Sequence, residues 1–241
     1  MLLVLAAACG ERRQVTVQVQ VPDLNGIDTP IAGVVVAVLP YDRDSLIAAM
    51  EQRASAGRPH TQTLDSLFQA FHGPFLAFSR AAWQVERATR RRDSAASART
   101  AAAPGTPAAR ELDAMVAALD DTLRALAPAL ERTRAELARA RDTIWPRIEP
   151  LRAEARQWQH STFEGYDTAV RSLARRNMRT LRADTTDAAG WATLQVAPGR
   201  WWVHARSPDP QDPNFEWYWN VPVESDTVRL SPASGRHLPR Y

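Results

Sequence analysis

Residues 14–21 read QVTVQVQV, and their strict alternation predicts the structure of the first part of the chain. Every second residue is a valine, at Val15, Val17, Val19 and Val21, and the residues between them are Gln or Thr. Successive side chains of a β-strand point to opposite faces of its sheet, so this period predicts a strand with one buried face. The apolar run Ile31–Leu39 (IAGVVVAVL) predicts a second, more buried strand.

The last quarter of the chain resembles this first part in composition. Segments rich in Val, Trp and Thr predict four more strands, at Trp191–Val196, Arg200–Arg206, Phe215–Val223 and Thr227–Leu230. Asn25-Gly26 and the Pro-Asp pairs of 208–213 supply turns between predicted strands. Both ends of the chain therefore predict β structure.

Residues 43–180 are instead rich in Ala, Arg, Leu and Glu and predict helices. Apolar or small residues recur in steps of three and four at 112, 116, 119, 123, 126, 130, 137, 140, 144, 148 and 151, and upstream at 64, 68, 71, 75, 78, 82 and 85. This heptad seam is typical of a helix packed along another helix. Prolines are expected to kink or interrupt these helices, at Gly73-Pro74, Pro128, Pro146 and Pro150.

The segment Ser94–Ala109 holds small residues and prolines, so it predicts the tip that joins two antiparallel helices. Phe163, Tyr166, Val170 and Leu173 predict a last helix that returns to the sheet. We expect an α+β fold with three parts: a signal segment at 1–9, a β domain at 10–42 and 181–241, and a long α-helical hairpin or coiled-coil insertion at 43–180.

Composition excludes several classes of site. The single Cys excludes a disulfide framework and a Cys-based zinc or iron–sulfur site. All 30 basic residues are Arg, which excludes a Lys Schiff base and a P-loop lysine. The helical region is basic, a charge that suits anionic lipid or an acidic partner. Its charges are mixed along the helices, however, and this favours a solvated, salt-bridged face.

The N-terminus predicts an exported protein. Met1–Ala8 (MLLVLAAA) is apolar, ends in small residues directly before Cys9, and is too short to span a bilayer as a helix. Ala6-Ala7-Ala8-Cys9 resembles a bacterial lipobox, in which the cysteine becomes the lipidated first residue. The resemblance implies an extracytoplasmic lipoprotein, anchored at Cys9 on the periplasmic face or at the outer membrane. A free cysteine near an apolar start is the alternative.

A second resemblance concerns the strands. Thr186-Asp187-Ala188-Ala189-Gly190, then Ala192, Leu194 and Val196, then Pro198-Gly199-Arg200-Trp201, resembles the carboxypeptidase regulatory-like, or transthyretin-like, domain. Ile31-Ala32-Gly33-Val34-Val35-Val36 resembles an early strand of the same family. The resemblance implies an antiparallel β-sandwich that supports folding, binding or adhesion and lacks catalytic residues. Gly190 and Gly199 are suited to turns because glycine adopts positive φ readily. The long insertion at 43–180 is a departure from the family.

Tryptophans are concentrated among the last strands. Strand parity places Trp201, Val203 and Ala205 on one face, and Trp202, His204 and Arg206 on the other. We therefore consider one face for ligand binding or helix docking, with Trp191, Trp202, His204, Arg206, Trp217 and Trp219 as its candidate residues. Exposed Trp rings would stack sugars, whereas helices packed on them would bury them. Docking of the helical insertion is the hypothesis we favour.

No catalytic constellation is recognised in the sequence. The five histidines are scattered, and nucleophile elbows and glycine-rich phosphate loops are absent. We therefore expect no enzyme activity, no cofactor, no metal and no nucleic-acid partner. The predicted function is a membrane-anchored scaffold or a protein-binding subunit, such as the extrinsic part of an envelope, transport, respiratory or photosynthetic complex. The alternative is a carbohydrate-binding module that uses the Trp face.

Overall fold

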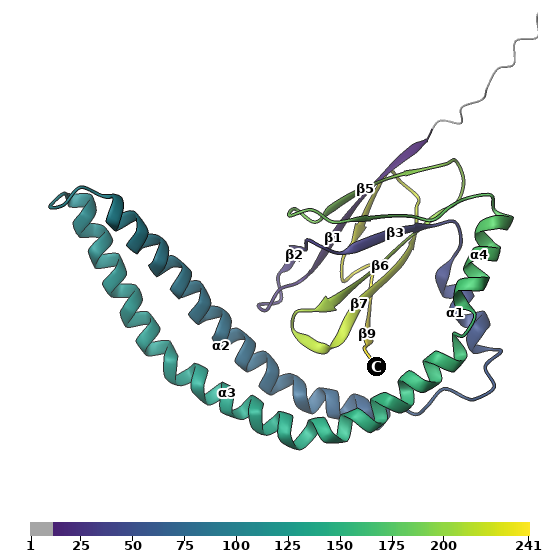
Figure 1. Cartoon of the computed structure of the whole chain (residues 1–241), viewed down its shortest axis with the longest axis horizontal. Helices are drawn as coiled ribbons and strands as arrows, with labels where there is room; N and C mark the ends of the chain where they lie inside the picture. The colour runs from purple at the N-terminus through teal and green to yellow at the C-terminus, as the bar shows by residue number, and fades with distance from the viewer. Residues whose placement is uncertain (1–11) are drawn as a thin grey trace, which may run out of the picture. The chain divides into compact units, whose positions relative to one another are not determined.

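The computed structural model describes residues 12–241 and has an α+β fold, with about half of the chain in helices and two β-sheets (Figure 1). The chain divides into two compact units. Unit 1 consists of Met1–Thr61 together with Arg152–Tyr241, and unit 2 is Gln62–Leu151. The four helices of residues 12–241 lie between β3 and β4, within residues 43–176, and the two ends of this helical region belong to the same unit as the sheets.

Unit 1 contains both sheets. The first joins β1 (Arg13–Pro22) to β2 (Asp28–Pro30), β5 (Trp191–Val196) and β8 (Thr227–Leu230). The second has the strand order β4 (Arg182–Thr185), β3 (Val35–Leu39), β6 (Trp202–Asp209), β7 (Asp212–Pro222) and β9 (Arg236–Pro239). Neighbouring strands are antiparallel except β1 and β8, which pair in parallel.

One hydrophobic core draws on both sheets. The alternation predicted for β1 is confirmed, because its four valines are at most 1% exposed. They share one buried cluster with residues of the other strands, namely Val34, Val36, Val38, Ala192, Leu194, Val196, Trp201, Val203, Ala205, Trp219, Val228 and Leu230. The inner face of each sheet therefore contributes to the same apolar interior.

The predicted strands at 191–196 and 227–230 are confirmed with the expected bounds. The strand expected at Ile31–Leu39 is shorter, because Gly33 has a φ of +78° and the chain becomes extended only from Val35. Positive φ is likewise found at Gly190 and Gly199, where turns were expected. The strands β2 and β9 were not predicted.

Two short helices and the end of a long one also belong to unit 1. They are α1 (Arg43–Glu51), α4 (Tyr166–Arg176) and the part of α3 (Pro107–Thr162) that follows Leu151. The Asp42 carboxylate caps α1 by accepting a hydrogen bond of 3.0 Å from the Asp44 amide, as is usual at a helix N-terminus. The predicted last helix is confirmed as α4.

Unit 2 is a pair of antiparallel helices, formed by α2 (Gln62–Ala101) and the first part of α3 (Figure 1). The predicted seam is confirmed, since every seam residue in both helices is buried or half-buried. Ala88 and Ala95 are buried one heptad apart, and such small side chains let two helices approach closely. Ion pairs between Arg92 and Asp120 and between Arg99 and Asp113 join the two helices.

The prolines do not interrupt the long helices. Both long helices continue through Pro74, Pro128, Pro146 and Pro150. The last three prolines are solvent-exposed, so water can bond the carbonyl groups that lose an amide donor. The tip is also shorter than the expected 94–109, because the Ala-rich segment stays helical to Ala101 and the chain turns only at 102–106.

Among the described residues no helix is both long enough and apolar enough to cross a membrane. The predicted lipid-attachment residue, Cys9, lies outside the described residues.

Candidate functional site

The side chains of residues 201–206 alternate between the two faces of the sheet as the sequence predicted. Trp201, Val203 and Ala205 are at most 2% exposed in the core. Trp202 and His204 lie on the opposite face, both half-buried, and Arg206 is exposed there. The guanidinium of Arg200 lies 4.8 Å from the centroid of the Trp202 ring.

The other three candidate tryptophans do not join this face. Ala205 is opposite Trp219 and Ser207 is opposite Trp217 in the β6–β7 register, and residues opposite each other point to the same side of a sheet. Trp219 is therefore fully buried in the core, and Trp217 packs against that core. Trp191 lies on β5 in the other sheet. The six candidate residues thus form no single platform.

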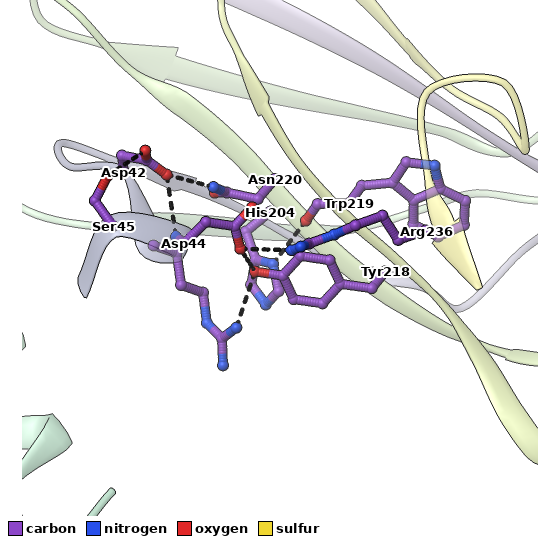
Figure 2. A network of polar contacts seen from close by, with 9 residues as sticks. Asp42, Asp44, Ser45, His204, Tyr218, Trp219, Asn220 and Arg236 are labelled. Carbon is purple, nitrogen blue, oxygen red and sulfur yellow. Dashed lines mark hydrogen bonds and ion pairs between the residues drawn. The ribbon is translucent and has the colours of Figure 1, made fainter. Parts of the chain in front are cut away.

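Tyr218 is the centre of the polar contacts on the outer face of β7 (Figure 2). Its hydroxyl donates to the Asp44 carboxylate at 2.6 Å and accepts a hydrogen bond of 3.0 Å from Arg43. Arg236 of β9 donates to the same Asp44 oxygen at 2.7 Å, and its guanidinium lies 4.8 Å from the centroid of the Tyr218 ring. This one ring therefore links β7, β9 and the start of α1.

A second set of contacts attaches the N-terminus of α1 to β7. The Asn220 amide and the Ser45 hydroxyl each donate to the Asp42 carboxylate at 2.6 Å (Figure 2). Burial raises the pKa of Asp42, but these two hydrogen bonds, together with those from the Asp44 and Ser45 amides, outweigh it and hold the pKa below its usual value. Asp42 therefore stays ionised and keeps α1 in place.

His204 is held neutral beside Tyr218, with 5.2 Å between the two ring centroids. Burial is the main cause that lowers its pKa to about 4, and the positive charges of Arg43 and Arg206 lower it further. A neutral imidazole whose Nδ1 lies 2.8 Å from the Trp219 carbonyl oxygen must donate its proton there. The low pKa of His204 thus reflects mainly its burial, with a smaller contribution from the neighbouring arginines.

A cleft of about 480 Å³ opens beside this network, within unit 1. Its charged lining consists of Arg43, Arg58, Arg206 and Arg236 together with Asp44 and Glu51. Arg236 is paired with Asp44, and Arg206 is paired with Glu216 of β7. Arg58 lies over the Trp158 ring, 5.8 Å from its centroid. The lining thus carries two more positive than negative charges.

Arg43 differs from the other arginines of the cleft in its partners. Its guanidinium lies 5.5 Å from the ring centroids of both Tyr166 and Tyr218. Within residues 12–241 no carboxylate lies within ion-pair distance of it. Burial and the hydrogen bond to Asp44 raise the pKa of Tyr218 to about 12, so this phenol is neutral at pH 7. The half-buried charge of Arg43 therefore has no directly bonded anion.

No family model, curated protein or solved structure matches this chain. The site must therefore be interpreted from its own chemistry. No group of three or more His, Cys, Asp or Glu residues in the described part of the chain could hold a metal ion. Guanidinium and phenol groups bind and orient anions, and this is the chemistry that the cleft offers.

Sequence reasoning placed His204 and Arg206 on this face but missed Arg43, Tyr166, Tyr218 and Arg236. Strand parity places Tyr218 and the buried Trp219 on opposite faces of the sheet, so the sequence did indicate that Tyr218 points outward. Arg43 and Tyr166 come from helices distant in sequence, with Arg43 and Tyr218 175 positions apart, and Arg236 comes from the unpredicted strand β9. The positions of α1 and α4 and the pairing of β9 with β7 bring them together.

Proposed function

We propose that the protein is a non-catalytic, membrane-anchored extracytoplasmic scaffold that binds another protein through its helical hairpin. The observation that carries this proposal is a groove on unit 2 beside Met115, which is 52% exposed. The two helices already bury the apolar seam between them, and Met115 remains exposed. An exposed apolar side chain of this size is suited to contact another protein.

The groove has a volume of about 420 Å³ and combines an apolar floor with basic residues. Ala95, Ala98, Leu112 and Met115 supply the apolar side chains, and Arg90 and Arg91 also line it. Methionine adapts to irregular surfaces because its side chain is flexible. A partner segment with apolar anchors and acidic neighbours would complement this groove, as an amphipathic helix does in helix-in-groove recognition.

The β domain of this proposed scaffold is a transthyretin-like sandwich. Support comes from the shared core of the two sheets and from the contacts of the Thr186–Gly190 motif. The buried Thr186 hydroxyl donates to the Ile31 carbonyl at 2.7 Å and accepts from the Val34 amide at 3.0 Å. Asp187 accepts from the Ala189 and Trp191 amides, both at 2.9 Å. The motif residues thus join the segment before β3 to the turn before β5.

The membrane anchor of the proposal is a lipid on Cys9, and its partner belongs to an envelope or integral membrane assembly. We prefer protein binding to carbohydrate binding because a sugar-binding surface needs several exposed tryptophan rings grouped on one face. Trp217 and Trp219 face the core instead, and Trp191 lies on the other sheet.

The test uses the full chain in its native host, cross-linked in intact cells before the membranes are solubilised. Met115→Asp places a charge in the groove, and Ala117→Asp is the matched control. Ala117 is also exposed, and two helical positions correspond to about 200°, so it lies on the other side of α3. Circular dichroism checks that both variants are equally helical.

We expect one cross-linked protein that wild type and Ala117→Asp capture equally and that Met115→Asp captures at least about tenfold less, a loss of about 1.4 kcal/mol. Equal capture by all three chains would overturn the groove as the binding surface. A wild-type chain that cross-links to no protein, but binds sugars on a glycan array, would replace the scaffold with the carbohydrate-binding alternative.

A further inference from the structure

We propose that the arginine-lined cleft of unit 1 is a binding site for a phosphate monoester. This site is separate from the groove of unit 2 and does not depend on the scaffold function. The inference rests on three observations in the cleft: the convergence of arginines, the incomplete charge balance and the aromatic wall.

The arginines converge on a single side chain. Arg43 donates to the Tyr218 hydroxyl, and Arg236 lies over the Tyr218 ring. Arg206 is the direct neighbour of Tyr218 across the β6–β7 pair, on the same face of the sheet. Arg236 and Arg206 already have carboxylate partners, in Asp44 and Glu216, so an anion bound between the three guanidinium groups would mainly neutralise Arg43.

The charge balance favours an anion, since the arginines outnumber the carboxylates by one even when Glu216 is counted. The lining carries four arginines and two carboxylates, and Glu216 outside the lining is bonded to Arg206. The excess is concentrated at Arg43, whose described partners are the neutral phenol of Tyr218 and the ring of Tyr166. A phosphate monoester carries a charge of about −1.5 to −2 at pH 7 and offers three acceptor oxygens.

Hydrogen-bonding capacity favours the same ligand. A guanidinium has five N–H donors in a planar fork, which matches the oxygens of a phosphoryl group. The contacts of Arg43 with two phenols leave further donors for a ligand, and they also hold its long side chain in position. The site is thus pre-organised, because the α1 cap and the hydrogen bonds of Asp44 fix the surrounding residues.

The aromatic wall accommodates the organic part of the ester. Phe163, Tyr166 and Tyr218 line the cleft beside the arginines, and ring faces bind planar or apolar groups. Trp158 packs beside Phe163 and Arg58 of this lining, and its Nε1 donates to the Ala56 carbonyl at 3.1 Å. A volume of about 480 Å³ suits a small molecule or one lipid headgroup.

Two sources can supply this chemistry, a soluble phosphate ester and a lipid headgroup. The experiment therefore uses phenyl phosphate as the soluble probe and phosphatidylcholine vesicles with or without phosphatidic acid as the lipid probe. Calorimetry with the full chain, at fixed salt, measures the affinity for phenyl phosphate, and benzylamine serves as a cation of similar size. Co-sedimentation measures vesicle binding, and phenyl phosphate is then added as a competitor.

Arg43→Gln removes the charge and keeps a donor for the Tyr218 hydroxyl. Arg58→Gln is a second variant, and it is safer for folding because Arg58 lies in an irregular segment. The matched control is Arg124→Gln, which removes an exposed arginine from the hairpin of unit 2. We expect each cleft variant to weaken phenyl phosphate binding at least about tenfold, while Arg124→Gln leaves it unchanged.

Vesicle binding that requires phosphatidic acid, is displaced by phenyl phosphate and is lost in Arg43→Gln would identify a lipid source. Phenyl phosphate binding without vesicle binding would identify a soluble ester. The proposal is overturned if wild type gives no heat with phenyl phosphate at about 1 mM, or if Arg43→Gln and Arg58→Gln both bind as wild type does. Neither result bears on cross-linking at the Met115 groove, so the two proposals fail separately.

Discussion

Acid should destabilise unit 1 through His204, the half-buried histidine on the outer face of β6. Burial is the main cause that lowers its pKa to about 4, and the nearby Arg43 adds to the effect. In the unfolded chain the pKa of a histidine is about 6.5. Between these two values the unfolded chain binds a proton that the folded protein does not bind. The free energy of unfolding therefore falls as the pH falls from 6.5 to 4.

The size of this loss follows from the two pKa values. One pKa unit corresponds to about 1.4 kcal/mol, so the full difference amounts to about 3 kcal/mol. Between pH 7.5 and 4.5 the linkage relation gives about 2.5 kcal/mol, and the partial exposure of the ring reduces this to about 2 kcal/mol. The loss is complete only below pH 4.

Urea denaturation at pH 7.5, 6.5, 5.5 and 4.5 measures this contribution. Tryptophan fluorescence reports mainly on unit 1, which holds six of the eight tryptophans. His204→Gln keeps a donor for the Trp219 carbonyl but does not titrate, and His60→Gln, at an exposed position, is the control. We expect the acid loss to be about 2 kcal/mol smaller in His204→Gln than in wild type and His60→Gln. Parallel pH profiles for all three chains would refute the reasoning.

Three further predictions concern the core and the anchor. Gly235→Ala should lower the free energy of unfolding of unit 1 by about 1–3 kcal/mol in the same assay, because the added Cβ would lie 2.5 Å from Nε1 of the buried Trp219. Unchanged stability would contradict this packing. Trp201→Ala should lower the free energy of unfolding by about 3–5 kcal/mol, because Trp201 is buried in the core. Trp202→Ala should lower it by only about 1–2 kcal/mol, because Trp202 is half-buried on the other face; equal losses would contradict this placement. Cys9→Ser should move the protein from the membrane fraction to the soluble fraction, and intact mass of the native protein with an unmodified Met1 would end the lipoprotein hypothesis.

The sequence predicted those elements in which one pattern of buried residues repeats several times. The valines of β1 and the apolar seam of α3 each repeat one pattern several times, and the structure buries the residues that the pattern selects. The short strands gave no such pattern. β4 has four residues, all exposed, and it is a strand only because it pairs with β3. Tertiary pairing of this kind cannot be recognised in four residues.

The candidate site could be predicted only in part, for a related reason. Parity within one strand placed His204 and Arg206 outward. Assigning Trp217 and Trp219 to a face also required the register between β6 and β7, which the sequence does not specify. The cleft further requires that α1 and α4 pack near the same sheet, and this brings Arg43 and Tyr166 together with Tyr218.

The way in which α1 docks explains why a cleft exists at this face. The sequence favoured helices packed on tryptophans, an apolar contact that would exclude water and close the surface. The structure instead attaches α1 through directional hydrogen bonds, from Tyr218 to Asp44 and from Asn220 to Asp42. Such bonds hold a helix at a set distance without filling the space beside it. The charged side chains of Arg43 and Arg236 then line that space, and the anion that we propose would displace water from it.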